Sequence, residues 1–333
     1  MTSADDFDAM PRAALFVRLL VVGALALAGC APSQVIDVPS SNQDGRVRFL
    51  VLHFTDENFE RSLDLLTRKH DNPVSAHYLV SRAGEYGRKP PTILRLVDES
   101  QRAWHAGPSR WQGHEPLNGE SIGIEIVYES HCSRERGAPG RSPSAKGRSP
   151  SAKGRSPSAA EAMEDRERPA EAADGRHRPP GVSPWVDDAI CPYPPYPLDQ
   201  IDAVIALARG ILKRHPEIEA SRVVGHADIQ PENKTDPGPM FPWRQLAAAG
   251  IGAWYDDTDV AHFRTYFAAH AAPLKLVQQA LIAYGYGLEA SGLDDLRTHE
   301  VLSAFQSHFL PDRRSGVADV ETVATLFALL SKY

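Results

Sequence analysis

The most informative stretch of the sequence covers residues 223–239 and reads VVGHADIQPENKTDPGP. Its β-branched start predicts a short strand that delivers His226 into a loop, and three prolines stiffen the rest of that loop. Lys234 and Asp236 lie in the same loop. An imidazole, an ammonium and a carboxylate held together in this way suit a metal site with a charge stabiliser beside it. A polar surface loop with a chance histidine is the alternative interpretation.

A second histidine closes another predicted strand. Residues 47–53 read VRFLVLH, an apolar run with His53 at its carboxyl end. Ligands of open α/β sheets gather outside the carboxyl ends of strands, so we expect His53 to lie near the first loop. His53, His226 and Asp236 would then supply three protein ligands, the number that a catalytic zinc ion uses while its fourth position stays open for water. A structural role for His53 is the alternative.

A carboxylate lies within a third predicted strand. Residues 121–127 read SIGIEIV, so a period of two puts the isoleucines on one face and Glu125 on the other. Burying an acid in such a strand costs free energy unless the acid has a partner. Water at a metal is one such partner, because it needs a general base. An exposed face of an edge strand is the alternative.

These segments form part of an ordered pattern of five motifs. The other two are SAHYLV at residues 75–80 and AWHAG at residues 103–107. The pattern resembles the zinc-dependent N-acetylmuramoyl-L-alanine amidases of the type 2 class, relatives of phage T7 lysozyme and the peptidoglycan-recognition proteins. It covers about residues 46–250, less one insertion. The resemblance implies hydrolysis of the amide bond between N-acetylmuramic acid and L-alanine in peptidoglycan or muropeptides.

The resemblance also implies a role for each matched residue. It implies His53, His226 and Asp236 as zinc ligands, Glu125 as the catalytic acid and base, and Lys234 as the stabiliser of the oxyanion. The chemistry agrees with these residue types. Zinc polarises a carbonyl and lowers the pKa of water to about 7, a carboxylate carries protons, and an ammonium stabilises developing negative charge. The sequence contains no G-x-S-x-G motif, which argues against a mechanism with a serine nucleophile.

Three further side chains are predicted to bind substrate. Tyr78 lies where some members of the family place a catalytic tyrosine. Trp104 suits stacking on a sugar ring, although a core tryptophan is the alternative, and His105 follows it in a loop that contains glycine and proline. We interpret His77 and His105 as support or cleft lining rather than as zinc ligands.

The N-terminal residues of the sequence predict that the protein is secreted across a membrane. Residues 19–28 form an apolar run that two arginines precede, and the run is too short to span a bilayer as a mature helix. This pattern is typical of a secretory signal peptide. Three aspartates near Met1 are unusual in such a segment, so translation from Met10 is an alternative start.

The residues after this run predict a lipid anchor. Residues 27–30 read LAGC and resemble a bacterial lipobox, so we expect residues 1–29 to be removed and Cys30 to carry lipid. The next residue is Ala31 rather than aspartate, and in this the sequence resembles lipoproteins that are sorted to the outer membrane. We therefore expect an outer-membrane lipoprotein that faces the periplasm, with residues 30–45 as a linker. A cleaved signal with a chance cysteine is the alternative.

The other two cysteines flank an unusual insertion. Residues 133–181 contain no Val, Ile, Leu, Phe, Trp or Tyr, and residues 140–160 carry three copies of a heptad that begins Gly-Arg-Ser-Pro-Ser-Ala. Because such a segment cannot form a core, we predict that the insertion 133–184 is disordered. In an oxidising periplasm Cys132 and Cys191 make one possible disulfide.

Strands alternate with helices around this insertion. Five strands are predicted, at about residues 47–54, 77–81, 92–97, 121–127 and 222–225. An apolar stripe predicts a helix over residues 198–215, and a shorter helix begins at Phe59. The predicted fold class is therefore α/β, with a mixed β-sheet flanked by helices in an amidase domain over residues 46–256.

The tail predicts a second, smaller domain over residues 258–333. Three helices are expected, at residues 274–284, 296–309 and 320–330. Residues 304–326 are similar to small three-helix peptidoglycan-binding domains, and a helical packing module without a ligand is the alternative. On this basis we expect truncation after Tyr255 to weaken binding to sacculi while hydrolysis of soluble muropeptides persists.

Composition gives no sign of nucleic-acid binding, since the net charge is −7 and 42% of the residues are hydrophobic. We expect a monomer whose partners are a muropeptide substrate and, through the lipid anchor, a membrane. Two other classes remain as alternatives. One is a recognition lipoprotein that binds muropeptides without hydrolysis, against which the complete set of ligands and catalytic residues argues. The other is a tether between envelope and wall that needs no metal.

Overall fold

The computed structural model describes residues 37–42, 45–130 and 193–333. Gly45–Tyr333 form one compact unit, and residues 37–42, the described residues before it, contain no helix or strand. The predicted signal peptide, lipidated Cys30, the possible Cys132–Cys191 disulfide and the insertion all lie outside the described residues. Among the residues that the structure describes, no helix is long and apolar enough to cross a membrane.

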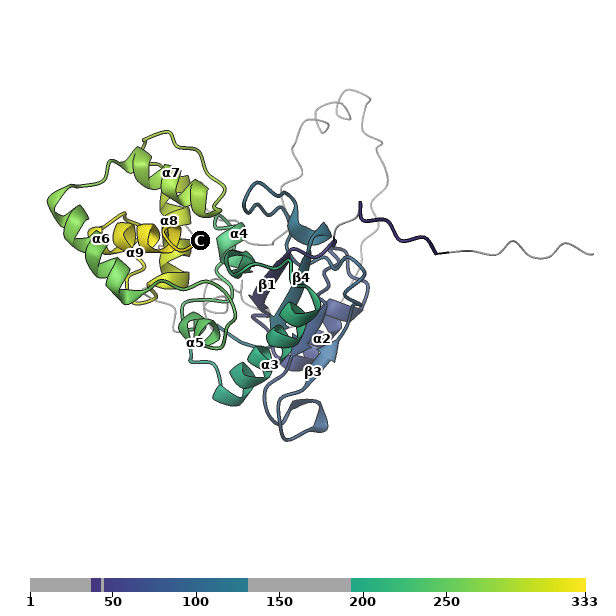
Figure 1. Ribbon diagram of the computed structural model, residues 1–333. Helices are drawn as coiled ribbons and strands as arrows, with labels where there is room; N and C mark the ends of the chain where they lie inside the picture. The colour runs from purple at the N-terminus through teal and green to yellow at the C-terminus, as the bar shows by residue number, and fades with distance from the viewer. Residues whose placement is uncertain (1–36, 43–44, 131–192) are drawn as a thin grey trace, which may run out of the picture. The chain divides into compact units, whose positions relative to one another are not determined.

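A mixed sheet of five strands carries the predicted site residues His53 and Glu125 (Figure 1). Its order is β3-β2-β4-β1-β5. The β2–β3 pair is antiparallel and the other neighbours are parallel. The strands are β1 (Phe49–Phe54), β2 (Tyr78–Val80), β3 (Ile93–Arg95), β4 (Ser121–Ile126) and β5 (Val223–Gly225). Each lies within its predicted range, and the predicted α/β fold with a mixed sheet is confirmed.

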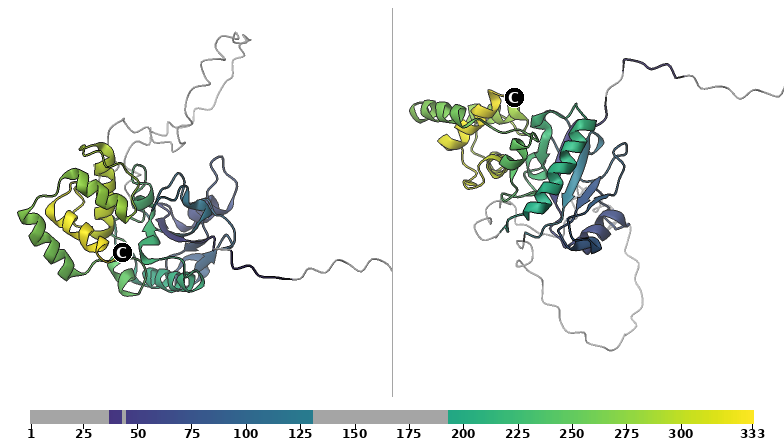
Figure 2. Two further views of the ribbon diagram at one scale, coloured as in Figure 1. Left: turned by 45° about the horizontal axis from the view of Figure 1, so that its top comes forward. Right: turned by 60° about the horizontal axis from the view of Figure 1, so that its bottom comes forward.

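Helix α3 (Leu198–Arg214) covers one face of this sheet, as the two further views show (Figure 2). Strand alternation sends the leucines of β1 and the isoleucines of β4 to this face, where they pack with the apolar stripe of α3. Burying each such side chain contributes roughly 1.5–3 kcal/mol. Gln200 of α3 also donates hydrogen bonds to the carbonyls of Val80 and Val127, at 3.3 and 2.9 Å. This face of the sheet is therefore an apolar core, and the side-chain amide group of Gln200 that is buried in it has hydrogen-bond acceptors.

The C-terminal part is helical and comprises α6 (Asp257–Ala269), α7 (Leu274–Tyr284), α8 (Leu296–Phe309) and α9 (Val320–Leu330). The last three have the predicted bounds, whereas α6 was not predicted. The apolar pattern that would predict α6 from the sequence is weak, because few of its side chains are buried. Val260 and Phe267 are its buried residues. Helix α6 packs mainly on α9.

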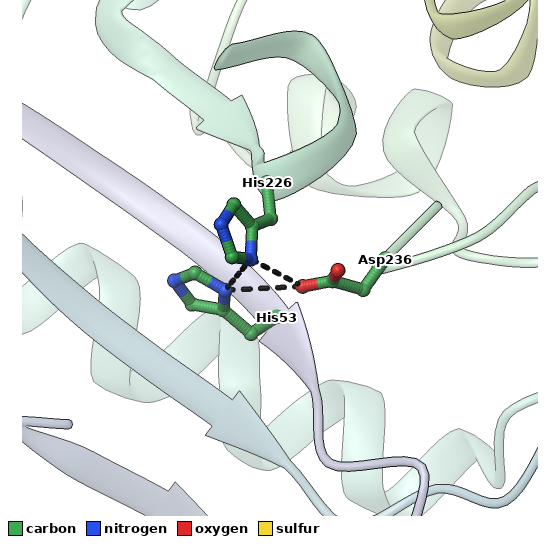
Figure 3. A group of neighbouring side chains, drawn as sticks. All are labelled: His53, His226 and Asp236. Atoms are coloured by element: carbon green, nitrogen blue, oxygen red, sulfur yellow. Dashed lines mark hydrogen bonds and ion pairs between the residues drawn. The ribbon is translucent and has the colours of Figure 1, made fainter. Parts of the chain in front are cut away.

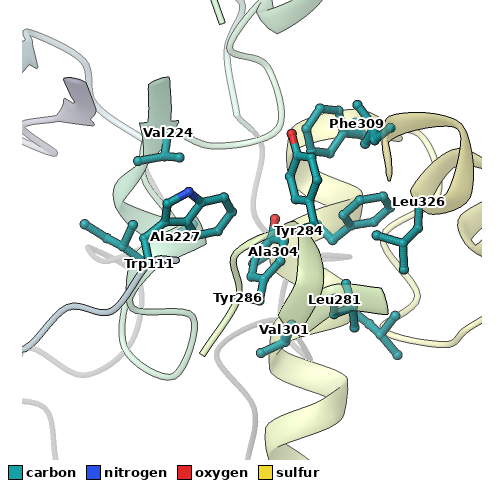
Figure 4. Close-up of a cluster of buried hydrophobic side chains, with 14 of the residues drawn as sticks. Trp111, Val224, Ala227, Leu281, Tyr284, Tyr286, Val301, Ala304, Phe309 and Leu326 are labelled. Carbon is teal, nitrogen blue, oxygen red and sulfur yellow. The ribbon is translucent and has the colours of Figure 1, made fainter. Parts of the chain in front are cut away.

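One hydrophobic core joins these helices to the sheet (Figure 4). Trp111 belongs to this core and lies edge-on to Tyr286 with ring centroids 4.7 Å apart, and its indole N–H donates to the Ser221 carbonyl at 2.9 Å. Gly285 allows this packing, because a Cβ there would lie 2.6 Å from Cε2 of Trp111. The predicted boundary near residue 257 thus does not separate two cores. Phe49 and Val224 of the sheet pack in the same cluster as the C-terminal helices.

Candidate metal centre

Three donor atoms converge where β1 and β5 end (Figure 3). These strands are parallel neighbours, so His53 in β1 and His226, the first residue of α4 (His226–Ile229), come to the same edge of the sheet. Nδ1 of His53 lies 3.0 Å from Nδ1 of His226 and 3.0 Å from Oδ2 of Asp236. The distance from His226 Nδ1 to Asp236 Oδ2 is 3.2 Å.

This arrangement fits a metal ion. Ligand atoms about 2.0–2.1 Å from a tetrahedral metal lie roughly 3.3 Å from one another, close to the observed spacing. Hydrogen bonds alone explain the group poorly, since Nδ1 of His53 would have to serve two partners at once. All three side chains are buried, and their donor atoms lie within 4.8 Å of one another. The predicted ligands are therefore brought together by the fold.

The protonation states also suit a cation. Burial, followed by the neighbouring His226, lowers the pKa of His53 to about 4. Burial by itself raises the pKa of Asp236, but His226 and His53 outweigh that effect and hold it well below its usual range. At neutral pH the imidazole of His53 is thus neutral and the carboxylate of Asp236 is ionised. These are the forms that bind metals.

A chain of hydrogen bonds fixes the orientation of His53. Nε2 of His53 lies 3.0 Å from Nδ1 of His105, and Nε2 of His105 lies 3.1 Å from Oγ of Ser121. Because the Ser121 hydroxyl donates to the Leu117 carbonyl at 2.7 Å, it accepts from His105, which in turn accepts from His53. The proton of His53 is then on Nε2, and the Nδ1 lone pair points to the metal position. His105 thus supports a ligand, as predicted.

The ring of His105 lies directly against β4. A Cβ at position 123 would be 2.5 Å from Cγ of His105, so only glycine allows this approach. The sequence motif SIGIE therefore encodes two things, a glycine that makes room for the supporting histidine and Glu125 two residues later.

Glu125 faces the metal position from β4. It pairs in register with His53 of β1, and its Oε2 atom is enclosed without a hydrogen-bond partner among the described residues. Burial, and then the charge of Asp236, raise the pKa of Glu125 well above its usual range. A carboxyl group with a raised pKa can both accept and return a proton near neutral pH.

A cleft of about 200 Å³ opens beside these residues. Lys234, Trp104 and His105 line it together with Glu125, and the Trp104 side chain is 47% exposed. An exposed indole next to the reactive groups suits stacking on a sugar face. The apolar wall of the cleft, formed by Leu65 and Leu66 of α2 (Phe59–Thr67) and by Val74, was not predicted, because the sequence pattern does not distinguish such residues from core residues.

Tyr78 does not lie in this cleft, which corrects the predicted substrate contact. It pairs in register with Ile124, so its side chain joins the core under α3, on the face opposite Glu125. Its hydroxyl donates to Oε1 of Glu99 at 2.6 Å. Burial and this hydrogen bond raise the pKa of Tyr78 to about 12. The prediction failed because a position one residue away along a strand faces the other side of the sheet.

His77 has a structural role, as predicted. Its Nδ1 accepts a hydrogen bond from the Gly123 amide at 3.0 Å, and its Nε2 lies 3.1 Å from the Gln101 carbonyl. Both ring nitrogens are therefore occupied by backbone groups, and His77 is not one of the converging ligands.

Comparison with known proteins agrees with this geometry. Residues 43–239 match the family model described as N-acetylmuramoyl-L-alanine amidase, and residues 270–326 match that of a putative peptidoglycan binding domain. The chain is 35% identical to N-acetylmuramoyl-L-alanine amidase AmiD of Escherichia coli K12 over 329 residues, which cover 94% of this chain and 97% of the relative.

Two solved structures are similar over most of the chain. One is AmpDh3 from Pseudomonas aeruginosa in complex with an anhydromuramic pentapeptide, 35% identical with a TM-score of 0.68 over 90% of this chain and 99% of that one. The other is AmiD from E. coli in complex with anhydro-N-acetylmuramic acid-L-Ala-D-gamma-Glu-L-Lys. It is 32% identical, with a TM-score of 0.64 over 89% of this chain and 93% of that one.

Proposed function

Because this chain belongs to the N-acetylmuramoyl-L-alanine amidase family, we propose that a zinc ion held by His53, His226 and Asp236 takes part in its reaction. The reaction is hydrolysis of the amide bond between N-acetylmuramic acid and L-alanine. The observation that carries the zinc proposal is the convergence of two imidazole nitrogens and one carboxylate oxygen at separations of 3.0–3.2 Å. Two nitrogens and one oxygen in a site of this size are a donor set typical of catalytic zinc.

A bound zinc ion supplies Lewis acidity to the scissile carbonyl and makes water more acidic. Glu125 accepts a proton from the attacking water as its oxygen bonds to the carbonyl carbon. When the carbon–nitrogen bond breaks, Glu125 returns that proton to the amino group of L-alanine. The raised pKa of Glu125 supports both steps, because the carboxyl group holds the proton between them.

Lys234 lines the same cleft as Glu125, and we assign its ammonium to the oxygen of the tetrahedral intermediate. Trp104, at the open side of this cleft, is assigned to the sugar ring. The relatives solved with anhydromuramic peptides support soluble 1,6-anhydro-muropeptides as substrates, and with them a role in recycling of cell-wall fragments.

We further propose that the protein is a lipoprotein of the outer membrane, anchored through Cys30, facing the periplasm and monomeric. The support is the sequence LAGC at residues 27–30 with Ala31 after it. Mass spectrometry of the mature N-terminal peptide is expected to find a lipid-modified cysteine, and Cys30→Ser is expected to release the protein from membranes. An unmodified mature N-terminus at another residue would contradict this assignment. Analytical ultracentrifugation of the delipidated protein tests the monomer.

Metal removal and restoration test the zinc proposal. Purified protein is dialysed against a chelator and assayed by mass spectrometry on an anhydro-muropeptide, following release of the L-alanine stem peptide. We expect activity to disappear with the metal and to return with about one zinc ion per chain. Full activity after complete metal removal would overturn the proposal. Tight binding of the muropeptide by the zinc-loaded protein with no release of peptide would favour a recognition protein instead.

A further inference from the structure

Asp228 fixes the backbone that carries the ligand His226. Its Oδ2 atom accepts a hydrogen bond at 2.8 Å from the amide of Gly225, the residue directly before α4. The carboxylate therefore ties the beginning of α4 to its third residue. Because His226 is the first residue of this short helix, the direction of its side chain depends on how Asp228 is held.

The other partners of Asp228 come from the C-terminal helices. The hydroxyl of Tyr286, just after α7, donates to Oδ1 at 2.7 Å. Nδ1 of His308, in α8, donates to Oδ2 at 2.8 Å. Asp228 is 2% exposed and His308 is 6% exposed, so water contributes little to either group. A buried carboxylate next to a ligand thus depends on two donors from a distant part of the chain.

Both donors are held rigidly by aromatic packing. The imidazole of His308 is stacked on Trp243, with centroids 3.8 Å apart, and on Phe309, at 4.0 Å. The ring of Tyr286 packs edge-on against Trp111. Nε2 of His308 has no hydrogen-bond partner among the described residues, so the contact with Asp228 is its polar interaction. Rings fixed in this way present their donors to Asp228 in one geometry.

We propose that Tyr286 and His308 are positioning residues of the metal site, and that they act by holding Asp228 so that Nδ1 of His226 faces the other two ligands. The inference rests on the proposed function in taking His226 as a ligand. It gives the C-terminal helices a part in hydrolysis itself, which differs from the expectation that soluble substrates are cleaved without them.

Two further contacts point the same way. Ala227 and Ile229 of α4 belong to the hydrophobic core that the C-terminal helices complete. Arg297 of α8 forms an ion pair with Glu232, two residues before Lys234 in the loop that leads to Asp236. The C-terminal helices thus contact the segment between the second and third proposed ligands at its beginning and again at Glu232.

A double variant, Tyr286→Phe with His308→Phe, tests the inference in the full-length protein. Both substitutions keep an aromatic ring for packing and delete the donor to Asp228. We expect the zinc dissociation constant, measured by competition with a chromophoric chelator, to rise about 10–100-fold, as when other supports of metal ligands are removed. The rise should be accompanied by a fall in kcat at saturating zinc rather than by a change in KM alone.

A matched control separates positioning from general stability. Arg264 forms a two-pronged ion pair with Glu321 between α6 and α9, and α6 packs mainly on α9. Arg264→Gln is expected to lower the unfolding temperature and leave the zinc dissociation constant unchanged. If the double variant fails to fold, Tyr286→Phe alone, which loses a single hydroxyl, decides the question with an expected rise of about twofold or more.

The outcomes distinguish this inference from the proposed function. If the wild-type protein binds zinc and the variants bind it equally well, Tyr286 and His308 have only a structural role, and the zinc proposal still stands. Wild-type protein that binds no zinc would remove the zinc proposal first. A zinc dissociation constant that rises in the variants and not in Arg264→Gln supports the inference.

Discussion

Two glutamates on opposite sides of the sheet show how environment separates an acid that is fixed as a charge from one that is suited to proton transfer. Near the end of α3, Glu99 is bound by Arg214, Tyr78 and His215, and mainly Arg214 lowers its pKa to about 2. Across the sheet, Glu125 is enclosed beside the ligands with one oxygen unpartnered among the described residues, and burial raises its pKa well above its usual range. A carboxylate surrounded by donors is fixed as a charge, whereas one without them can exchange a proton.

The different environments of the two glutamates follow from how β2 and β4 pair. Tyr78 pairs with Ile124 and Leu79 with Glu125, so neighbouring residues of β2 and β4 face opposite sides. One side is closed by α3, while the other opens into the cleft. Substitutions on the two sides test this division, beginning with the largest expected effect.

Removing a ligand should affect only the cleft side. Asp236→Ala is expected to lose zinc and activity together, because two histidines rarely hold a catalytic zinc ion alone. Tyr78→Phe, on the α3 side, should keep both. Metal content by atomic emission and muropeptide hydrolysis measure the contrast. A fully active Asp236→Ala protein would break the assignment, and a zinc-free Tyr78→Phe protein would break the division between faces.

The two glutamates should respond differently to the same substitution. Glu125→Gln keeps shape but cannot accept a proton, so zinc should stay while kcat falls by about 10²–10⁴. Glu99→Gln should leave kcat nearly unchanged. Steady-state kinetics on both zinc-saturated variants measure this contrast in kcat. Near wild-type kcat in metal-replete Glu125→Gln would exclude the proposed proton transfer.

Lys234→Ala should have a somewhat smaller effect. The variant is expected to retain zinc and to lose on the order of 10²–10³ in kcat, the usual contribution of an oxyanion donor. Lys213→Ala, in the last turn of α3, is the control and should match the wild type. A change confined to KM would show that Lys234 binds substrate without stabilising the transition state.

The smallest effect concerns acid stability. Glu99 has a folded-state pKa of about 2 against a usual value of 4.5, so its ionised form stabilises the folded state above that usual value. This contribution should vanish as pH falls from 4.5 through 2. Glu99→Gln should therefore unfold roughly 2–4 °C below wild type near neutral pH, and the gap should narrow in acid. Calorimetry at several pH values measures it, and a constant gap would contradict the charge-based explanation.

The candidate site was largely predictable because its residues lie at the ends or on defined faces of strands. His53 closes an apolar run, and alternation separates Glu125 from the isoleucines, so both were placed by local pattern. Tyr78 was misplaced since its pattern does not reveal which side of the sheet holds the metal. Helix α6 was missed because its weakly amphipathic sequence depends on contact with α9.

The sequence by itself determined the strands, the three C-terminal helices and the proposed ligand set, because period-two alternation, helical stripes and loop chemistry are local properties. Only the tertiary structure decided that His105 orients His53 and that Tyr286 and His308 reach Asp228. These contacts join residues 52, 58 and 80 positions apart. The first contact needs the assembled sheet, and the other two also need the core that the sheet shares with the C-terminal helices. Packing over such separations leaves no periodic signal in the chain.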